Sequence, residues 1–352
     1  MFENKGKHKE INQGQKPQIN LARSTSGRMW LVNLCAFMVV LQSSFTDSYS
    51  SFILALSAVS AAVLTEFLIL LKSGREKSLM DGSAIASALI LVLFLPNRIS
   101  PIYAALGAFF SIAVIKHSFG GLGANWLNPA AGGWLFIRFS WPASFTDALR
   151  GSPLSAIGEN IREGSYGIDA FFTSYSPFGD ALRTFLNKTI FSLPGVELPV
   201  GYMDLFASRF PGIIADRGVF ALLLGTLIIT ASQVNRSWIP AAYLAVFGVL
   251  VRFAGAVPFG SGYWNGDVIF ALFSGGTLAA AFFLAADPAT TAKSSVGILI
   301  AALAAGCMAF VLRWFGNEPY GVVLTAVFIN AMLPMFRVLE SRQLYKRQRP
   351  QS

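Results

Sequence analysis

The sequence is poor in charged side chains. Of its 352 residues, 13% are Asp, Glu, Lys or Arg and 54% are hydrophobic, and the mean hydropathy is +0.56. Soluble domains carry about 25% charged residues, so this chain has about half the charge that a water-facing surface needs. The composition therefore excludes an ordinary soluble domain and a disordered chain, and it predicts an integral membrane protein.

Cysteine and histidine are also scarce. The two cysteines, Cys35 and Cys307, lie far apart and each within an apolar run, which excludes a disulfide scaffold. We expect both to be buried as small hydrophobic side chains. The two histidines, His8 and His117, leave no His/Cys cluster that would bind a metal.

Long apolar segments fill most of the chain. A membrane span needs about 20 such residues. Ten segments qualify as candidate spans, although several are short enough to indicate tilted or broken helices inside a bundle. They lie near 29–45, 49–71, 81–95, 101–116, 127–142, 212–232, 238–254, 267–286, 296–314 and 319–337.

The basic residues indicate an orientation. With ten spans, both termini share one side of the membrane, and that side collects 17 of the 27 Lys and Arg residues. Because Lys and Arg prefer the cytoplasmic side, we expect both termini of this multi-pass membrane protein to be cytoplasmic. The basic tails could also bind nucleic acid or anionic lipid. Topology signals are far commoner in such a chain, so we expect contact with membrane lipid and none with nucleic acid.

One polar segment interrupts the spans. Residues 143–211 are too rich in aromatic residues for a disordered linker, among them Tyr166, Phe171, Phe172, Tyr175, Phe178, Phe185 and Phe191. We expect a folded cap of about 70 residues on the outer face. The predicted organisation is a basic tail, a five-span half, the cap, a second five-span half and a second basic tail, at 1–28, 29–142, 143–211, 212–337 and 338–352.

The two halves resemble each other weakly. Asp81-Gly82-Ser83 leads through an apolar run to Leu95-Pro96, and Gly266-Asp267 leads through another to Asp287-Pro288. Five spans per half would place the copies in opposite orientations, which is an inverted repeat with polar sites near the midplane. The alternative is that any two apolar segments punctuated by Gly and Pro look alike. The predicted fold is an all-α membrane protein of about ten helices in two inverted five-helix repeats.

The stretch from Lys116 to Ala130 is the most informative for chemistry. Gly120, Gly121 and Gly123 would let the backbone approach a flat ligand closely. Asn125 and Asn128 can present donors and acceptors to one ligand, such as the polar edge of an isoalloxazine or quinone ring. The alternative interpretation is a generic glycine-rich turn.

An acidic residue inside a span suggests a second kind of site. Glu66 lies well within the second span, with Lys72 and Arg75 near enough in sequence to pair with it. An unpaired charge at the bilayer centre costs about 2.5–3.5 kcal/mol or more. Glu66 is therefore the candidate for the handling of an ion or a proton.

The run from Lys116 to Trp141-Pro142, with its glycines and Asn128-Pro129-Ala130, closely resembles the RnfD/NqrB family. Further similarities are Asp81-Gly82-Ser83-Ala84, Leu193-Pro194-Gly195, and Ser274-Gly275-Gly276 with Asp287-Pro288. The resemblance covers roughly 29–337, and the chain length favours RnfD. It implies a flavin-carrying membrane subunit of an Rnf-type ion-translocating oxidoreductase, which passes electrons between partner subunits, coupled to Na⁺ or H⁺ transport.

The resemblance also implies two flavins. One FMN is usually esterified to a Thr in a motif reading Asp-x-x-Ser/Thr-Gly-Ala-Thr. Ser176 stands at that place here, Tyr175 replaces the Ala, and Thr173 is the second candidate acceptor. Linkage at Ser176, non-covalent FMN and no FMN all stay open. The Gly120-Gly121, Gly123, Asn125 and Asn128 element is intact, and by resemblance it would help to hold a second, non-covalent flavin such as riboflavin.

The resemblance implies that partner flavin and iron–sulfur subunits carry the steps at NAD and at iron. The chain has no thiolate or haem ligand set of its own, so an organic cofactor is the way in which it could carry electrons. Two other functions stay open. Inverted five-span repeats also build small-solute channels and transporters, and a member that has lost its flavin would fit that function. The second of these other functions is that of a scaffold that only assembles partner subunits.

Overall fold

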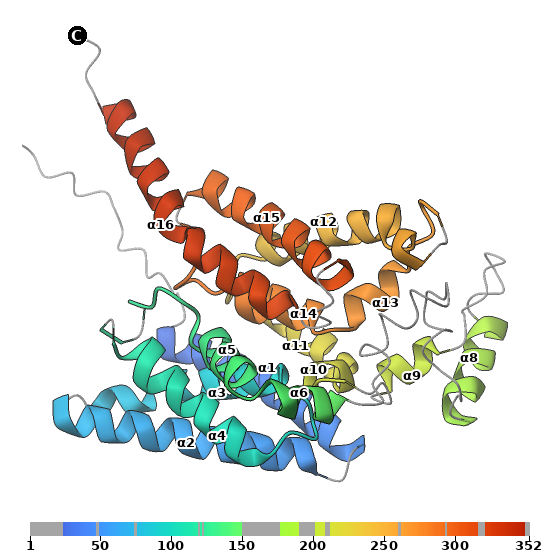
Figure 1. Cartoon of the computed structure of the whole chain (residues 1–352), viewed down its shortest axis with the longest axis horizontal. Helices are drawn as coiled ribbons and strands as arrows, with labels where there is room; N and C mark the ends of the chain where they lie inside the picture. The colour runs from blue at the N-terminus through green and yellow to red at the C-terminus, as the bar shows by residue number, and fades with distance from the viewer. Residues whose placement is uncertain are drawn as a thin grey trace, which may run out of the picture.

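The computed structural model describes residues 24–46, 49–73, 76–118, 120–121, 123–149, 177–189, 201–207, 212–259, 262–292, 294–315 and 321–348. Within these residues the regular structure is helical, apart from one isolated bridge between Pro96 and Ile213. The prediction of an all-α membrane protein agrees with this architecture. Helices are labelled as in Figure 1.

The first half begins with two long helices and continues with shorter ones. Its elements are α1 (Thr25–Thr46), α2 (Ser50–Ser73), η1 (Glu76–Asp81), α3 (Ser83–Leu93), α4 (Pro101–Phe110), η2 (Ser111–Lys116) and α5 (Pro129–Ser140). Proline marks the helix starts, because its fixed φ suits the first turn and its missing N–H costs nothing there. Pro101 opens α4 and Pro129 opens α5. The π-helical η2 continues α4 directly.

The second half contains a broken helix. Its elements are α10 (Ile214–Arg217), α11 (Val219–Ala231), α12 (Trp238–Ala254), η5 (Val257–Phe259), α13 (Val268–Phe273), α14 (Thr277–Ala279), η6 (Ala280–Ala285), α15 (Ser295–Trp314) and α16 (Gly321–Gln348). The break between α13 and α14 falls at Ser274-Gly275-Gly276, where both glycines have positive φ. Such a conformation is open to glycine and costly for other residues.

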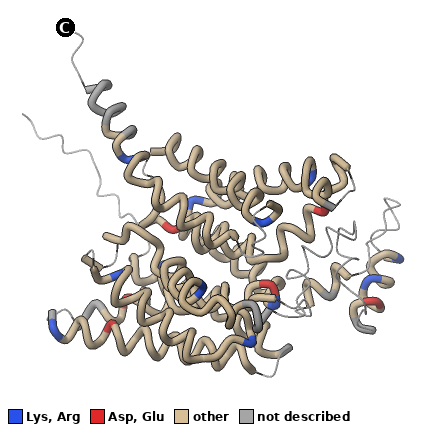
Figure 2. Tube along the Cα trace, viewed as in Figure 1, with Lys and Arg blue, Asp and Glu red and all other residues tan. Residues whose placement is uncertain are grey.

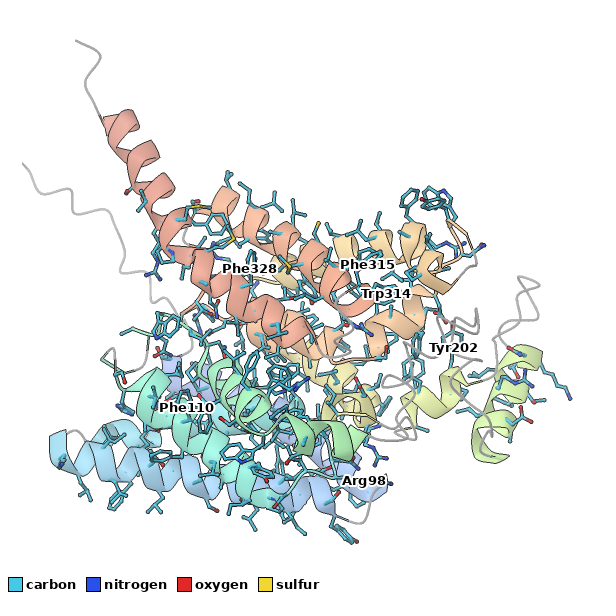
Figure 3. The ribbon with its side chains drawn as sticks, viewed as in Figure 1. Arg98, Phe110, Tyr202, Trp314, Phe315 and Phe328 are labelled. Carbon is cyan, nitrogen blue, oxygen red and sulfur yellow. The ribbon has the colours of Figure 1, made fainter. Side chains whose placement is uncertain are left out.

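Three helices of the intervening segment are described: α6 (Pro142–Leu149), α8 (Pro177–Thr189) and α9 (Tyr202–Phe206). The hydroxyl of Tyr202 donates to Asp267 Oδ2 at 2.7 Å, which fastens α9 to the start of α13 (Figure 3). The rest of the predicted cap lies outside the described residues. The predicted cap boundary at 143 falls inside α6.

Four helices, α1, α2, α15 and α16, are long and apolar enough to cross a membrane. The segments α3, α4 with η2, α11 and α12 are apolar but shorter. Each of the ten candidate spans therefore contains a helix in the described residues, while ten full crossings stay a prediction. The helix α16 runs eleven residues past the predicted boundary at 337, to Gln348, because its basic and glutamine-rich end is made of good helix formers.

Helix packing follows a similar order in both halves. The most extensive contacts within the halves join α2 to α4 and α12 to α15, and those between the halves join α1 to α11. Figure 1 shows α1 to α5 grouped on one side and α12, α15 and α16 on the other. The pairing of α2 with α4 corresponds to that of α12 with α15, and the repeat stays a prediction. The inversion itself stays a prediction.

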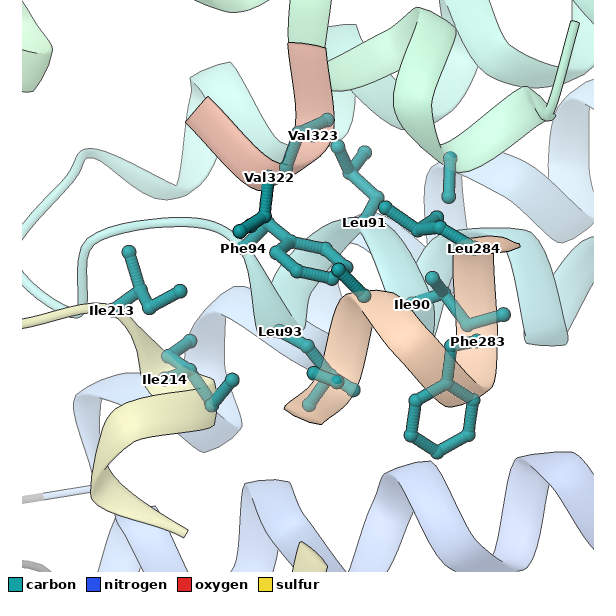
Figure 4. Packing of buried hydrophobic residues seen from close by; sticks show 14 of the residues in the cluster. Ile90, Leu91, Leu93, Phe94, Ile213, Ile214, Phe283, Leu284, Val322 and Val323 are labelled. Atoms are coloured by element: carbon teal, nitrogen blue, oxygen red, sulfur yellow. The ribbon is translucent and has the colours of Figure 1, made fainter. Parts of the chain in front are cut away.

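The shared core lies where α3 meets the second half. Figure 4 shows Ile90, Leu91 and Phe94 of the first half packed with Phe283 and Leu284 of η6 and with α10 and α16. The outside is also apolar: Figure 2 shows few charges along the tube, and side chains such as Phe328 in Figure 3 are exposed. Apolar side chains on the outside suit a lipid environment. Of the two cysteines, Cys35 is buried as expected and Cys307 is exposed.

Candidate functional site

A pocket of about 500 Å³ opens at the end of the bundle where α1 begins and α16 leaves it. This volume lies within the range of 300–1,000 Å³ that is usual for sites of small organic ligands. We call it the tail pocket. Both halves line it, and its polar side chains are Arg28, Ser83, Lys116, Asn125, Asn128 and Asp287, among others.

The glycine-rich loop between η2 and α5 borders this pocket. Gly120, Gly121 and Gly123 all have positive φ, between +86° and +113°. A Cβ at Gly121 or Gly123 would meet nothing within 4 Å, so it is backbone conformation that requires glycine there, and space beside the backbone is left open. Gly123 lines the tail pocket. This open backbone agrees with the predicted close approach of a ligand.

Asn128 caps a helix and joins the two halves of the protein. Its Oδ1 accepts from the backbone N–H groups of Ala130 and Ala131, which makes it the N-cap of α5. Its Nδ2 donates to Asp287 Oδ2 at 2.9 Å, across the interface between the two halves. The predicted projection of Asn128 toward a ligand is therefore only partly right: the side chain lines the pocket, and its hydrogen bonds go to the protein.

Asp287 is the residue that sequence reasoning missed. It lies just beyond η6, and it accepts from Asn128, from Thr290 Oγ1 and from the backbone N–H of Ala289. Burial raises the pKa of the Asp287 carboxyl above its ordinary value, and these three donors oppose that rise. The signal in the sequence is Asp287-Pro288, which on its own indicates only the end of a span.

The side chain of Asn125 has an acceptor oxygen that is not used within the described residues. It is buried in the pocket lining, and its Oδ1 accepts no hydrogen bond from the described residues. A buried acceptor without a donor costs about 1–3 kcal/mol. A ligand that brings an N–H or O–H group to this atom would recover that free energy.

Glu66 is paired with Lys116, a lysine of the pocket lining. Lys116 Nζ donates to Glu66 Oε1 at 2.5 Å and to Ser83 Oγ at 2.6 Å, and all three side chains are buried. The expected pairing of Glu66 with Lys72 is wrong. Six residues along a helix turn the side chain by about 600°, which places Lys72 on a different face of α2, and its side chain is exposed. Arg75 lies outside the described residues.

Two more groups face this pair. His117 Nε2 lies 3.6 Å from Glu66 Oε1. The pKa of His117 lies below its usual value, first because burial disfavours the imidazolium and then because the Lys116 ammonium is close, with Glu66 and Asp81 acting the other way. Asp81 Oδ1 accepts from the backbone N–H and the hydroxyl of Ser83. The second oxygen of Glu66, Oε2, is buried and accepts no hydrogen bond from the described residues.

A second buried cation lies in the other half. Arg313 of α15 donates to the carbonyl oxygen of Ala271, to Thr277 Oγ1 and to Ser274 Oγ, all at the break between α13 and α14. Its guanidinium also lies over the rings of Phe247 and Trp314. The position of Arg313 near the end of a span predicts a side chain that reaches the membrane surface or caps a helix. It caps a broken helix and is buried.

The two predicted acceptors of a covalent flavin, Ser176 and Thr173, lie outside the described residues. The first described residue after them is Pro177, which opens α8. Their role as acceptors stays a prediction.

The chain matches a known protein family over most of its length. The model of the NQR2, RnfD, RnfE family matches residues 12–346. The chain belongs to this family. Both the tail pocket and the Glu66–Lys116 pair therefore lie within the matched region.

The chain is similar over most of its length to the D subunits of several complexes. It is 30% identical over 319 residues to the D subunit of the proton-translocating ferredoxin:NAD⁺ oxidoreductase complex of Clostridium ljungdahlii, covering 91% of each chain. It is 24% identical over 331 residues to the D subunit of the Na⁺-translocating ferredoxin:NAD⁺ oxidoreductase complex of Acetobacterium woodii, covering 94% of this chain and 93% of that one. The D subunit of an ion-translocating oxidoreductase complex of Alcanivorax borkumensis is 32% identical over 290 residues, which cover 81% of this chain and 82% of that one.

Proposed function

We propose that this protein is the flavin-carrying RnfD-type membrane subunit of an Rnf-type complex, and that it passes electrons between partner redox subunits while the complex moves Na⁺ or H⁺. Family membership and the names of the relatives support this role. Because one of those relatives is named for protons and another for sodium, the family leaves the ion open. In this proposal both termini face the cytoplasm, and the ten helices form two inverted repeats in the inner membrane.

The observation that carries the proposal is the free acceptor in the tail pocket. A non-covalent flavin such as riboflavin has a flat ring with donors and acceptors along one edge. Asn125 Oδ1 would accept from that edge, and the open backbone at Gly123 would lie against the ring. The Lys116 ammonium would supply positive charge near it. The residues present therefore fit such a group.

The flavin would supply one- and two-electron transfer, and the chain would supply orientation and electrostatics. Asn128 and Asp287 would keep the two halves in register around the pocket through their hydrogen bond. The apolar lining from α1 and α3 would limit water beside the ring. An FMN esterified at Ser176, with Thr173 as the second candidate acceptor, would be the other redox group, on the outer face.

Flavin analysis of the purified complex tests the proposal. After denaturation, fluorescence that migrates with this polypeptide reports covalent FMN, and flavin released into the supernatant reports the non-covalent one. We expect released flavin in a 1:1 ratio to this chain, and loss of covalent fluorescence in Ser176→Ala but not in Thr173→Ala. If the complex contains neither form on this chain, the electron-carrier function is wrong. Uptake of a small solute by liposomes that contain the isolated chain would then establish a transporter.

A further inference from the structure

Lys116 lies between the tail pocket and the buried carboxylate of Glu66, which the proposed function does not connect. One side of its ammonium group faces Glu66 and Ser83, at 2.5 Å and 2.6 Å, and the same side chain lines the tail pocket. Glu66 lies seven residues before the end of α2, which is about 10 Å along the helix axis. A single cation therefore serves a buried carboxylate and the wall of a ligand site.

The charges around this pair nearly balance. Glu66 and Lys116 compensate each other, and the lowered pKa of His117 leaves its imidazole neutral at pH 7. Asp81 is joined to the pair through Ser83. Asp287 and two exposed arginines, Arg28 and Arg337, also line the pocket. In this balance, any further negative charge in the pocket competes with Glu66 for the Lys116 ammonium.

The Glu66 carboxylate is sensitive to such a competition. Its Oε2 is buried and has no hydrogen-bond donor among the described residues, so the carboxylate depends on Lys116 for most of its compensation. Uncompensated charge in a buried site costs several kcal/mol. A carboxylate that loses part of its partner must therefore take up another cation.

We propose that Lys116 couples the charge of the tail pocket to Glu66, so that reduction of the ligand in the pocket is balanced by uptake of one monovalent cation at the Glu66 carboxylate. This inference rests on the proposed flavin in the pocket. One electron enters from a low-potential donor, which is oxidised by one electron, and one cation enters at Glu66. If that cation is a proton, it forms an O–H bond with Glu66; if it is Na⁺, no covalent bond forms or breaks.

A redox titration of the non-covalent flavin tests this coupling in the purified complex, with dithionite as the reductant. A background of Ser176→Ala with Thr173→Ala removes any esterified FMN from the signal. We expect the midpoint potential in this background to rise with the concentration of the coupled cation. The titration is repeated at several pH values without sodium and at several sodium concentrations at one pH. A dependence on sodium, or a dependence on pH that is steeper than in Glu66→Gln, supports the coupling.

The variants give opposite shifts. Glu66→Gln removes the competitor for Lys116, so the midpoint should rise. It should also lose its dependence on sodium or, if the coupled cation is a proton, keep only the pH dependence that comes from protons bound by the reduced flavin itself. Lys116→Gln removes the positive charge beside the ligand, so the midpoint should fall, again without dependence on the cation. If Lys116→Gln does not fold, the double variant Glu66→Gln with Lys116→Gln leaves no uncompensated charge and should show the same loss of dependence. Lys72→Gln, at an exposed lysine of the same helix, is the matched control and should titrate like the parent.

Infrared difference spectra separate the two cations. Proton uptake at Glu66 gives a carboxylic-acid band on reduction that is absent in Glu66→Gln, and sodium uptake gives none. A midpoint whose dependence on sodium and on pH is the same in the parent and in Glu66→Gln overturns the coupling. A complex without releasable flavin overturns the proposed function instead, so the two failures are distinguishable.

Discussion

Each half of the molecule buries a cation near the end of its fourth candidate span, Lys116 in the first half and Arg313 in the second, and the surroundings of these two cations differ. Lys116 and Arg313 lie near the ends of the helices that pack most closely on α2 and α12, and both donate to a serine hydroxyl. Arg313 meets a carbonyl oxygen, two hydroxyls and two aromatic faces. Lys116 meets a carboxylate and a pocket.

This difference separates a structural cation from a functional one. A guanidinium is a rigid fork that can bind several acceptors at once, which suits the broken helix between α13 and α14. An ammonium on a flexible stem is a point charge that can be shared between two anions. The half that binds the lysine is therefore the half in which charge can be redistributed.

The largest expected effect comes from removing the lysine. Lys116→Met leaves Glu66 buried and uncompensated, which should lower the free energy of unfolding by about 3–5 kcal/mol. Adding Glu66→Gln should recover most of this loss, because the buried charge is then gone as well. Thermal unfolding of the four proteins in this double-mutant cycle, in detergent, measures the coupling. Additive losses would mean that the pair does not interact as described.

Arg313→Met should cost less, about 2–3 kcal/mol. The hydroxyls of Ser274 and Thr277 keep acceptors of their own, at Phe270 and Ala271, while the carbonyl oxygen of Ala271 loses the donor that Arg313 supplies. The same unfolding measurement checks this, with the exposed Arg252→Met as the control. Flavin released per folded chain should not change. A loss of flavin in Arg313→Met would contradict the division between the two cations.

The smallest effect concerns Asp287. Its folded-state pKa is raised, so the neutral carboxyl stabilises the folded protein at pH values below the unfolded pKa. That contribution is lost as the pH rises through the raised value. Asp287→Asn cannot titrate, so its Tm relative to wild type should rise as the pH increases above about 4, the ordinary pKa of an aspartate. A constant difference above this pH would show that Asp287 is not desolvated.

Local signals predicted the elements of the fold well. Asn128 before Pro129 specifies a helix start, and the structure has the cap and the first turn at those residues. The glycines at 275 and 276 mark the break in the second half. Helix length was harder to predict. The low hydropathy of the charged end of α16 predicts a tail after residue 337, but the helix continues to Gln348.

The contacts within the candidate site could not be predicted from local sequence signals. Glu66 and Lys116 are 50 residues apart, and Asn128 and Asp287 are 159 residues apart. Nothing in the spacing of these residues shows which charges will meet, because helix packing decides it. The sequence identified Glu66, Asn125 and Asn128 as candidates; the structure identifies Lys116 as the residue between them.

The most direct test of the account is the flavin content of Asn125→Leu. This change removes the free acceptor in the tail pocket, and Asn330→Leu is the matched control, since Asn330 is another buried asparagine with an unpaired amide atom, in α16. Releasable flavin is measured by fluorescence after denaturation of each purified complex, at equal amounts of folded chain. We expect Asn125→Leu to bind flavin at least about tenfold more weakly, and Asn330→Leu to retain it. Equal flavin in Asn125→Leu and wild type would contradict the assignment of the tail pocket.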